Sequence, residues 1–413
     1  TGSFGTLEIP GKFILDSNSR ISLSNNDASD KTTLFGFEAG SLIASGDDEN
    51  TMIGHQAGLR TTGGYNTYVG ADAGLGASGA DSFNVGVGRS SLFAVTTGNQ
   101  NTVIGNRSGL SLTTGIKNVF IGSNAGNGTT DVDNTVIIGE TAAIANMTSA
   151  ADGTVAIGKT SLTALTSGIG NVAIGSGSMA ANATSDFNVA IGTNTLGKLT
   201  NDGTTANTAV GYKAAETMTT GTKNTAVGYE ALKSCDDGLN NTALGYQALT
   251  ADAGNNNTGL GYLALRATTG AQNTAVGAQA SVNMGGGANN VSLGMNSLLD
   301  VVDGSQNVAI GSQAIGGTLG TTADNASDLI AIGYQALGGN WENVALTDNI
   351  AIGTSAMGGA INGAINCIAI GRETLDGVLT TGANGTVGIG YQALKALTSG
   401  GKNLAIGYEA GKE

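Results

Sequence analysis

The chain has 413 residues, of which 69 are glycine and one is proline, while 4% are aromatic and 12% are charged. Large hydrophobic residues are too few for an ordinary globular core, yet the chain is not polar enough to be intrinsically disordered. The 31 acidic and 17 basic residues give a net charge of −14, which argues against nucleic-acid binding because phosphate contacts need clustered Lys and Arg.

Residues 1–31 precede the repeated part of the chain. They contain two short apolar stretches around the only proline, Pro10, followed by the alternating Ile21-Ser22-Leu23. Alternation of apolar and polar residues is typical of a half-buried strand. We interpret this segment as a small β lead-in or N-terminal cap that covers the first repeat.

From residue 32 onward a five-residue phrase, Asn-Thr-Ala-Val-Gly in one common form, returns every 16 to 22 residues. Its closing glycine, the marker glycine, identifies 22 copies. Self-similarity at a nearly fixed period is the signature of a repeat architecture. Well-formed copies begin and end at Asn171 and Gly175, Asn188 and Gly192, Asn224 and Gly228, Asn241 and Gly245, and Asn307 and Gly311.

Two columns of the phrase are apolar or β-branched. The residue just before the marker glycine is Ile, Val or Leu in every copy except Phe35, and the residue three before it is Thr, Val or Ile in every copy except Leu404. Side chains alternate across a strand, so these two columns share one face. Because β-branched residues suit a packed, pleated surface, we expect that face to be the buried core of each coil.

The residue between these two columns points to the opposite face. From Ala156 onward it is only Ala, Gly or Ser, whereas in the earlier copies it includes bulky residues such as Tyr68 and Phe120. A column without charge or bulk predicts a surface approached at backbone distance, so we expect it to face neighbouring subunits. The repeats then form a first block, residues 32–140, where the spacing between subunits should differ, and a regular alanine block, residues 141–413. The candidate subunit contacts are Ala173, Ala190, Ala226, Ala243 and Ala309.

Asparagine stands four residues before the marker glycine in 16 of the 22 copies. Its side chain can bond neighbouring backbone, and identical amides stacked coil over coil can form a hydrogen-bonded ladder. The marker glycine supplies the dihedral angles of a corner or the room for close backbone approach. Three residues later stands Ala, Ser or Thr, often followed by Leu, which indicates a second short strand.

These columns predict an all-β fold, a parallel β-roll or β-solenoid of about 22 coils of 16 to 22 residues. Stacking at roughly 4.8 Å per coil would make a rod about 100 Å long. Each coil needs only a thin aliphatic core, which accounts for the scarcity of large hydrophobic residues. Helix is disfavoured, because glycine inside a helix costs about 1 kcal/mol per site.

Tyr212, Tyr229, Tyr246 and Tyr262 directly follow the marker glycines of four successive coils. At this spacing the rings should stack on one another, since aromatic neighbours gain about 0.5–1.5 kcal/mol by offset packing. The sequence therefore predicts a tyrosine row. It is either a structural ladder or a strip that binds sugars.

The coils widen beyond Gly311, where residues 318–328 and 338–348 form longer excursions. The second of these contains the only tryptophan, Trp341. Because the period is nearly constant in the other coils, the extra residues of these two coils are expected to form loops that stand out from the shaft. Trp341 is a candidate surface contact, with the alternative that it anchors its own loop.

The sequence offers little material for chemistry. His55 is the sole histidine, and Cys235 and Cys367 lie eight coils apart, too far for a disulfide in a stacked rod, so buried free thiols are expected. The acidic turns lack a calcium-binding pattern and are interpreted as solvated surface charge. We expect no enzyme activity, no cofactor and no bound metal. No apolar run approaches the roughly 20 residues of a membrane helix, so membrane insertion is not expected.

At this point the phrases carry a resemblance. Asn171-Val-Ala-Ile-Gly175, Asn188-Val-Ala-Ile-Gly192 and Asn307-Val-Ala-Ile-Gly311 resemble the head repeats of trimeric autotransporter adhesins, the YadA-like heads. The longer phrase from Asn224 to Leu232 and the lead-in from Leu15 to Ser24 are similar to repeats of bacteriophage tail-fibre proteins. The resemblance implies a left-handed parallel β-roll, three copies around a threefold axis, and attachment to a cell surface. The coils here are longer than those of the adhesin heads, which bears on the cross-section.

The leading hypothesis is a structural and adhesive shaft of a phage tail fibre, located in the virion. Its partners would be two further copies of the chain, other fibre or tail proteins at its ends, including one that covers the last coil at Gly407, and a host-cell receptor. One alternative is the head of a bacterial trimeric surface adhesin. Another is an ice-binding solenoid, which needs a regular outward Thr array, whereas the Thr column here exchanges with Val and Ile as an inward column would.

Overall fold

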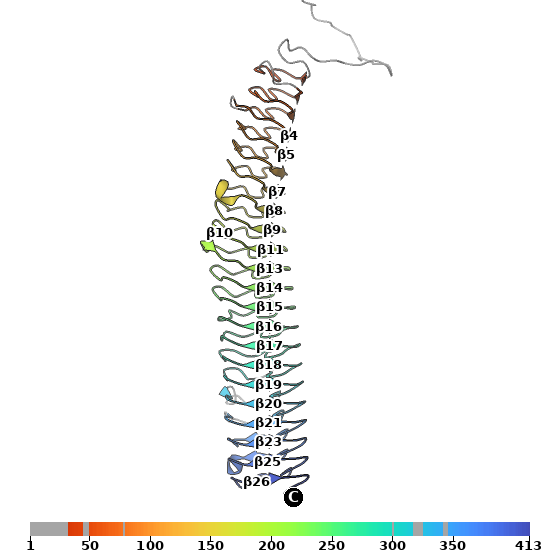
Figure 1. Ribbon diagram of the computed structural model, residues 1–413, viewed down its shortest axis with the longest axis vertical. Coiled ribbons are helices and arrows are strands. Elements are labelled where there is room, and N and C mark those ends of the chain that lie inside the picture. Colours follow the sequence, from red (N-terminus) through yellow and green to blue (C-terminus); the bar gives the residue numbers. More distant parts are fainter. Residues whose placement is uncertain (1–31, 44–48, 77–78, 300, 317–324, 342–345) are drawn as a thin grey trace, which may run out of the picture.

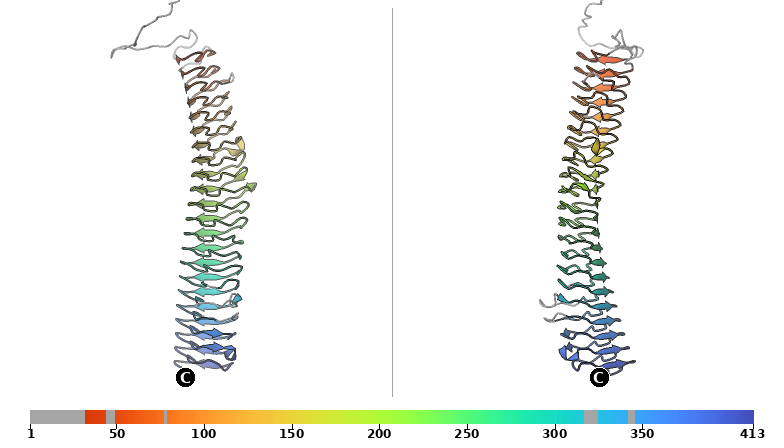
Figure 2. Two further views of the ribbon diagram at one scale, coloured as in Figure 1. Left: turned by 180° about the vertical axis from the view of Figure 1, so that it is seen from behind. Right: turned by 60° about the vertical axis from the view of Figure 1, so that its left-hand side comes forward.

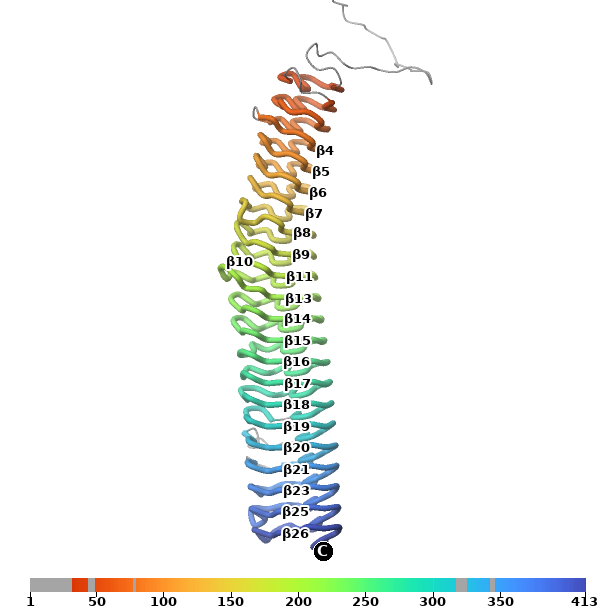
Figure 3. Tube along the Cα trace, in the orientation of Figure 1, coloured from red at the N-terminus to blue at the C-terminus, as the bar shows by residue number. Residues whose placement is uncertain are grey.

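The computed structural model describes residues 32–413, apart from 44–48, 77–78, 300, 317–324 and 342–345. The chain forms a long, gently curved rod of stacked coils (Figure 1), and two further views show the same single stack (Figure 2). Successive coils follow the sequence from one end of the rod to the other (Figure 3). The predicted lead-in, residues 1–31, lies outside the described residues.

One parallel sheet of 22 strands runs along the rod and corresponds to about 21 turns of solenoid. Each strand pairs in register with the equivalent strand of the next coil, as in the pairs Thr225↔Thr242 and Ala226↔Ala243. The predicted all-β parallel solenoid is therefore confirmed. The strands are β1 (Thr33–Phe35), β2 (Thr51–Ile53), β3 (Thr67–Val69), β4 (Val85–Val87), β5 (Thr102–Ile104), β6 (Val119–Ile121), β7 (Val136–Ile138), β8 (Val155–Ile157), β9 (Val172–Ile174), β11 (Val189–Ile191), β13 (Thr208–Val210), β14 (Thr225–Val227), β15 (Thr242–Leu244), β16 (Thr258–Leu260), β17 (Thr274–Val276), β18 (Val291–Leu293), β19 (Val308–Ile310), β20 (Ile330–Ile332), β21 (Ile350–Ile352), β23 (Ile368–Ile370), β25 (Val387–Ile389) and β26 (Leu404–Ile406).

The remaining elements lie in the turns between these strands. Strand β10 (Ser185–Asp186) pairs with β12 (Gly203–Thr204), and β22 (Ile361–Asn362) pairs with β24 (Leu379–Thr380), each in a small parallel sheet of its own. Two single 3-10 turns, η1 (Ser149–Ala151) and η3 (Thr381–Ala383), lie in these connections. The second regular strand predicted after each marker glycine is replaced by a run of turns.

The marker glycines form the corner at the end of each sheet strand. Gly228 has φ +138°, and a Cβ atom placed on it would lie 2.3 Å from the carbonyl oxygen of Gly245 in the next coil. The equivalent distance is 2.3–2.6 Å at every marker glycine from Gly36 to Gly390. Only glycine tolerates both this backbone conformation and this approach, so the predicted corner role is confirmed.

The asparagine column forms a ladder inside the rod. The backbone N–H of Asn241 donates to Asn224 Oδ1 (2.8 Å), and Asn224 Nδ2 donates to the carbonyl oxygen of Gly238 (2.7 Å). Each buried amide thus satisfies two backbone groups of the coil that follows, and the predicted ladder is confirmed. Asn171, Asn188 and Asn307 occupy the same buried position.

The alanine column lies inside each coil, and the two β-branched columns lie outside. Ala226 is only 1% exposed in the single chain, whereas Thr225 is exposed and Val227 is partly exposed. The prediction that the β-branched columns are the core was therefore wrong, and so was the assignment of the alanines to subunit contacts. A side chain sealed within its own coil cannot touch another chain. The corrected positions are Ala173, Ala190, Ala226, Ala243 and Ala309, all of them interior.

The reason for the inward alanines is the volume available inside a coil. In the coil of β14, Ala226 and Leu232, which stands four residues after the marker glycine, are both buried. In the third coil the sizes are exchanged, because Tyr68 fills the interior and faces Gly74, where a Cβ atom would come within 2.4 Å of the tyrosine ring. The same large-to-small pairing occurs at Leu34 with Gly40, Met52 with Gly58, and Phe120 with Gly126.

The bulky residues of the first block therefore belong to the core. Tyr68 and Phe120 are fully buried, and the Tyr68 hydroxyl donates to Asp81 Oδ2 (2.5 Å). Burial, together with the Asp81 carboxylate, holds the pKa of Tyr68 well above its ordinary value. The expectation that bulk in this column changes the spacing between subunits over residues 32–140 loses its basis. The sheet continues through the block boundary, where β7 pairs with β8.

Replacing Gly228 by alanine is expected to destabilise the rod by about 3 kcal/mol or more, because the added methyl group strains the corner and collides with the next coil. Gly203→Ala is the matched control. Gly203 also has a positive φ (+72°), but a Cβ atom there meets nothing within 4 Å. We expect it to cost about 1 kcal/mol. Urea denaturation followed by circular dichroism measures both, and equal losses would contradict the close-approach explanation.

The large-to-small pairing predicts compensation within one coil. Ala226→Leu should destabilise by about 1–3 kcal/mol through overpacking, and Leu232→Gly by about 3 kcal/mol or more through a cavity. The double variant reproduces the arrangement of Leu34 with Gly40 and should recover at least about 1 kcal/mol of the summed loss. A double-mutant cycle from denaturation midpoints tests this. Additive losses would show that the two positions do not share one interior volume.

Candidate interaction surface

The outer side of the 22-stranded sheet is a continuous uncharged surface. We call it the sheet face: the outward side chains of the first and third residues of each strand. Every member is Thr, Val, Ile, Leu or Phe. In the middle of the rod these side chains are well exposed, with Leu244 at 43% and Leu293 at 45%. Because the strands are in register, the two columns run without a break along the rod.

The extent of the sheet face distinguishes it from ordinary surface. Twenty-one steps of about 4.8 Å and a width of about 10 Å give on the order of 1,000 Å². Monomeric soluble proteins rarely expose contiguous apolar patches of more than a few hundred Å², and larger ones mark interaction sites. The lack of any charge along this strip, on a chain with a net charge of −14, points the same way.

The predicted tyrosine row is present. The ring centroids of Tyr212, Tyr229, Tyr246 and Tyr262 are 5.2, 5.2 and 5.5 Å apart, with each ring stacked on the next. Lys213 Nζ lies 5.5 Å from the centroid of Tyr212. The rings cover one another's faces, so no sugar ring fits between them. This arrangement favours the structural ladder over a sugar-binding strip, although the four side chains remain 43–52% exposed.

A second surface, the polar face, consists of the residues two and five positions after the marker glycines. Glu230 accepts hydrogen bonds from Lys233 Nζ and from Gln247 Nε2, both at 2.8 Å. These bonds, the Lys233 bond first, lower the pKa of Glu230. At Glu373 the bonds from Lys395 and Gln392 hold the carboxyl pKa at about 2. Such exposed pairs contribute little stability individually, but they make this face charged and solvated where the sheet face is not.

Trp341 does not form a surface contact. Its side chain is fully buried within the hydrophobic core of a widened coil, and its indole Nε1 has no hydrogen-bond partner among the described residues. The prediction of an exposed contact was wrong, and the alternative that the ring anchors its own segment agrees with this burial. A wider coil has more interior to fill, which explains the larger side chain. The two excursions, 318–328 and 338–348, lie partly outside the described residues.

The described residues offer no cluster for metal binding. No group of three His, Cys, Asp or Glu side chains among them could hold a metal ion. His55 stacks on Phe37 with ring centroids 5.6 Å apart, and its Nδ1 lies 3.6 Å from Asp72 Oδ1. Among the described residues, the structure contains no helix that could span a lipid bilayer.

Both cysteines are buried and unpaired, as predicted. Burial raises the pKa of Cys235 to about 11 and raises that of Cys367 above its ordinary value. Each thiol is therefore neutral in the folded protein at pH 8. Since the unfolded pKa lies near 9.0, burial of Cys235 as a thiol stabilises the folded state below pH 9, and this contribution is lost as the pH rises towards 11.

We expect the native protein to react negligibly with a disulfide reagent such as DTNB at pH 8, because the reactive thiolate is both scarce and sealed. The same protein in guanidinium chloride should release two equivalents of chromophore per chain. Cys235→Ser and Cys367→Ser variants assign each equivalent. Rapid labelling of the native rod would show that a thiol is exposed by local opening.

Comparison with known proteins adds no assignment, because no protein-family model matches the chain and no curated protein matches its sequence. The case for function therefore rests on the surfaces described above. The sheet face was missed as a surface from the sequence, although its lack of charge was visible there.

Proposed function

We propose that this chain is the shaft of a homotrimeric attachment fibre, in which three left-handed solenoids lie side by side with their sheet faces turned inward. The single observation that carries the proposal is the continuous uncharged sheet face. It replaces the alanine column as the subunit-contact surface. Covering this face removes exposed Val, Ile and Leu side chains from water, at roughly 25 cal/mol for each Å² buried.

The occupant that fits this face best is another copy of the same chain. A partner that matches the face along its whole length must repeat at the same rise of about 4.8 Å and present side chains of similar shape at each step. A second copy meets both conditions when the coils are in register. The area of about 1,000 Å² per chain also exceeds the roughly 800 Å² per partner of a standard stable interface.

The role in attachment rests on the resemblance of the repeats to phage tail-fibre and adhesin-head sequences. A bundle of long rods is suited to spacing a receptor-binding part away from a virion, with other fibre or tail proteins at its ends and a host-cell receptor as the external partner. Location in a virion tail fibre is our preferred reading. A bacterial trimeric surface adhesin head remains the alternative, because it would use the same rod and the same interface.

One observation favours a second candidate function. An ice-binding solenoid was disfavoured from the sequence because the Thr column was expected to point inward. In the structure this column points outward, so that argument does not hold. Thr208, Thr225, Thr242, Thr258 and Thr274 occupy the first position of five successive strands, β13 to β17. A flat array of this kind is what an ice-binding face needs. The coils on either side of these five carry Val or Ile at the same strand position, which favours contact with protein over contact with ice.

The oligomeric mass of the purified chain tests the proposal. Light scattering should give three times the chain mass of 40.5 kDa. The double variant Val227→Glu with Leu260→Glu should dissociate to single chains, because it would bury two unpaired carboxylates per subunit. Gln279→Glu with Gln313→Glu adds the same charge on the polar face and should leave the trimer intact. A monomeric native chain would contradict the fibre, and thermal hysteresis in that sample would support the ice-binding candidate.

A further inference from the structure

Two columns of side chains flank the sheet face along the rod. The leading column consists of the residues five positions before the marker glycines, and the trailing column consists of the residues directly after them. Phe83 and Phe187 in the leading column are 55% and 53% exposed, and Tyr229 in the trailing column is 43% exposed. Large exposed side chains therefore border the sheet face on both of its edges.

The backbone of the leading column makes its large side chains costly. Phe83 has φ +59° and Phe187 has φ +58°, a left-handed conformation that bulky residues adopt only with strain. Glycine avoids this strain, and Gly153 and Gly170 occupy the same column at φ +73° and +66°. The ring of Phe83 stacks on that of Tyr65, whereas Phe187 has no stacked ring among the described residues. An exposed ring kept in a strained conformation indicates a contact outside the chain.

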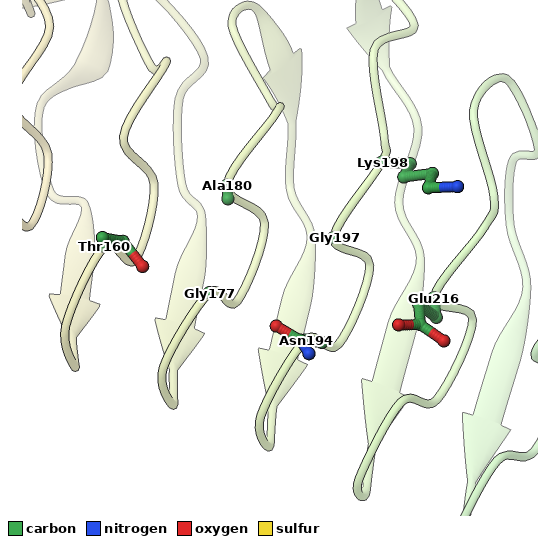
Figure 4. A pocket seen from close by; sticks show the side chains of 7 residues that line it. All are labelled: Thr160, Gly177, Ala180, Asn194, Gly197, Lys198 and Glu216. Carbon is green, nitrogen blue, oxygen red and sulfur yellow. The ribbon is translucent and has the colours of Figure 1, made fainter.

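The polar face offers no comparable contact for a second copy. Across the coils of β8, β9, β11 and β13 it carries Gly177, Ala180 and Gly197 between larger residues, which leaves a hollow of about 360 Å³ (Figure 4). The side chains around this hollow stand on the turns that follow the strands. Two rods packed in register along this face would both be hollowed at the same height. The sheet face and its two edges are therefore the better contact.

Rotational symmetry decides which edges meet. Three parallel copies around one axis are related by rotation alone, and each interface joins unlike surfaces of two neighbours. The sheet strands run across the rod (Figure 1), so the leading edge of one subunit meets the trailing edge of the next at the height of the same coil. Each leading residue is thus paired with the residue six positions later in the sequence, on the neighbouring subunit.

The pairs defined in this way are complementary. Phe83 is paired with Arg89 and Lys223 with Tyr229, which brings a cation opposite an aromatic ring in each case. From the coil of Gly54 onward, no coil carries aromatic side chains in both columns, and none carries like charges in both. Other large residues are paired with small or polar ones, as in Tyr65 with Ala71, Phe187 with Thr193, Ala206 with Tyr212, and Asn240 with Tyr246.

The cations do not find these partners within one chain. The two columns of the sheet face lie between Arg89 and Phe83, and likewise between Lys223 and Tyr229. In the part of the chain that the structure describes, neither Arg89 nor Lys223 has an ion pair or a ring contact. Both cations are therefore available to a neighbouring subunit.

We propose that the leading column of one subunit recognises the trailing column of the next, with Arg89 on Phe83 and Lys223 on Tyr229 holding the coils in register. The partner is a second copy of this chain, parallel to the first. The uncharged sheet face alone specifies the register weakly, because it is similar at every step of about 4.8 Å. The inference rests on the proposed function for the existence of the trimer, and it adds which edges meet and at what height.

Cross-linking of engineered cysteines tests the inference in a full chain whose native cysteines are replaced by serine. Lys223→Cys with Tyr229→Cys should be joined by bismaleimidoethane, a short thiol-specific cross-linker, into a covalent trimer on a denaturing gel. Lys223→Cys with Ala278→Cys is the matched control, because Ala278 lies in the same column three coils, or about 14 Å, further along the rod. This control should give at least tenfold less covalent trimer, as should each single-cysteine variant.

Charge reversal tests the two cations separately. Arg89→Glu with Lys223→Glu should lower the urea concentration that dissociates the trimer, because the negative face of an aromatic ring repels a carboxylate. Arg107→Glu with Arg266→Glu makes the same change of charge on the polar face and should leave that concentration unchanged. Circular dichroism confirms that each variant is folded.

Two results overturn the inference while the trimeric shaft stands. One is a trimer by light scattering in which Lys223→Cys with Tyr229→Cys gives no more covalent trimer than its control, since other edges or another register would then form the contact. The other is an equal loss of urea resistance in the two pairs of charge variants. A monomeric native chain instead contradicts the proposed function, and the edge contacts with it.

Discussion

The structure depends on the stacking of each coil directly on the next at the spacing of adjacent β-strands. This spacing leaves no room for a Cβ atom at the strand end, as the 2.3 Å approach at Gly228 shows. It also requires that every buried backbone group find a partner in the neighbouring coil. Next to the strand, the Asn224 side-chain amide supplies such partners. It accepts a hydrogen bond from the backbone N–H of Asn241 and donates one to the carbonyl oxygen of Gly238. Corner glycine and buried asparagine are therefore two parts of one solution.

The same stacking limits the interior and so creates the surface. Beside the strand, each coil has room for about one large and one small side chain, as Ala226 with Leu232 and Tyr68 with Gly74 show. With the interior filled in this way, the β-branched residues on either side of the alanine can only point outward. A strand with a single inward position thus produces two outward columns. Exposing so many uncharged, largely apolar side chains to water is unfavourable unless a partner covers them. The proposed function therefore rests on the sheet face.

Much of this fold follows from the sequence, and the failures have a common cause. The repeat, the parallel strands, the corner glycines, the asparagine ladder and the tyrosine row all depend on local spacing, which a sequence displays directly. An alternation of period two reveals which side chains share a face, but not which face is inside. Hydrophobicity suggested that Val227 is the interior residue, whereas the small volume inside the coil requires Ala226 there. The sequence did contain a usable signal, because the size of the middle strand residue varies inversely with that of the residue four after the marker glycine. Tyr68 occurs with Gly74, whereas Ala226 occurs with Leu232.

The prediction for Trp341 was wrong for a related reason. A longer coil is compatible both with an external loop and with a wider interior, and the sequence does not distinguish the two.

In a solenoid each coil contacts only its neighbours, so a local change of side chains leaves distant coils intact. The sheet face uses the first and third strand residues, while the polar face uses residues that follow the corner glycine. The two surfaces are thus assigned to different columns of one repeat. A substitution such as Gln279→Glu can alter the polar face without touching Val227, and the reverse is equally true. Association through the sheet face and the charge of the polar face are therefore physically independent properties of the same repeated unit.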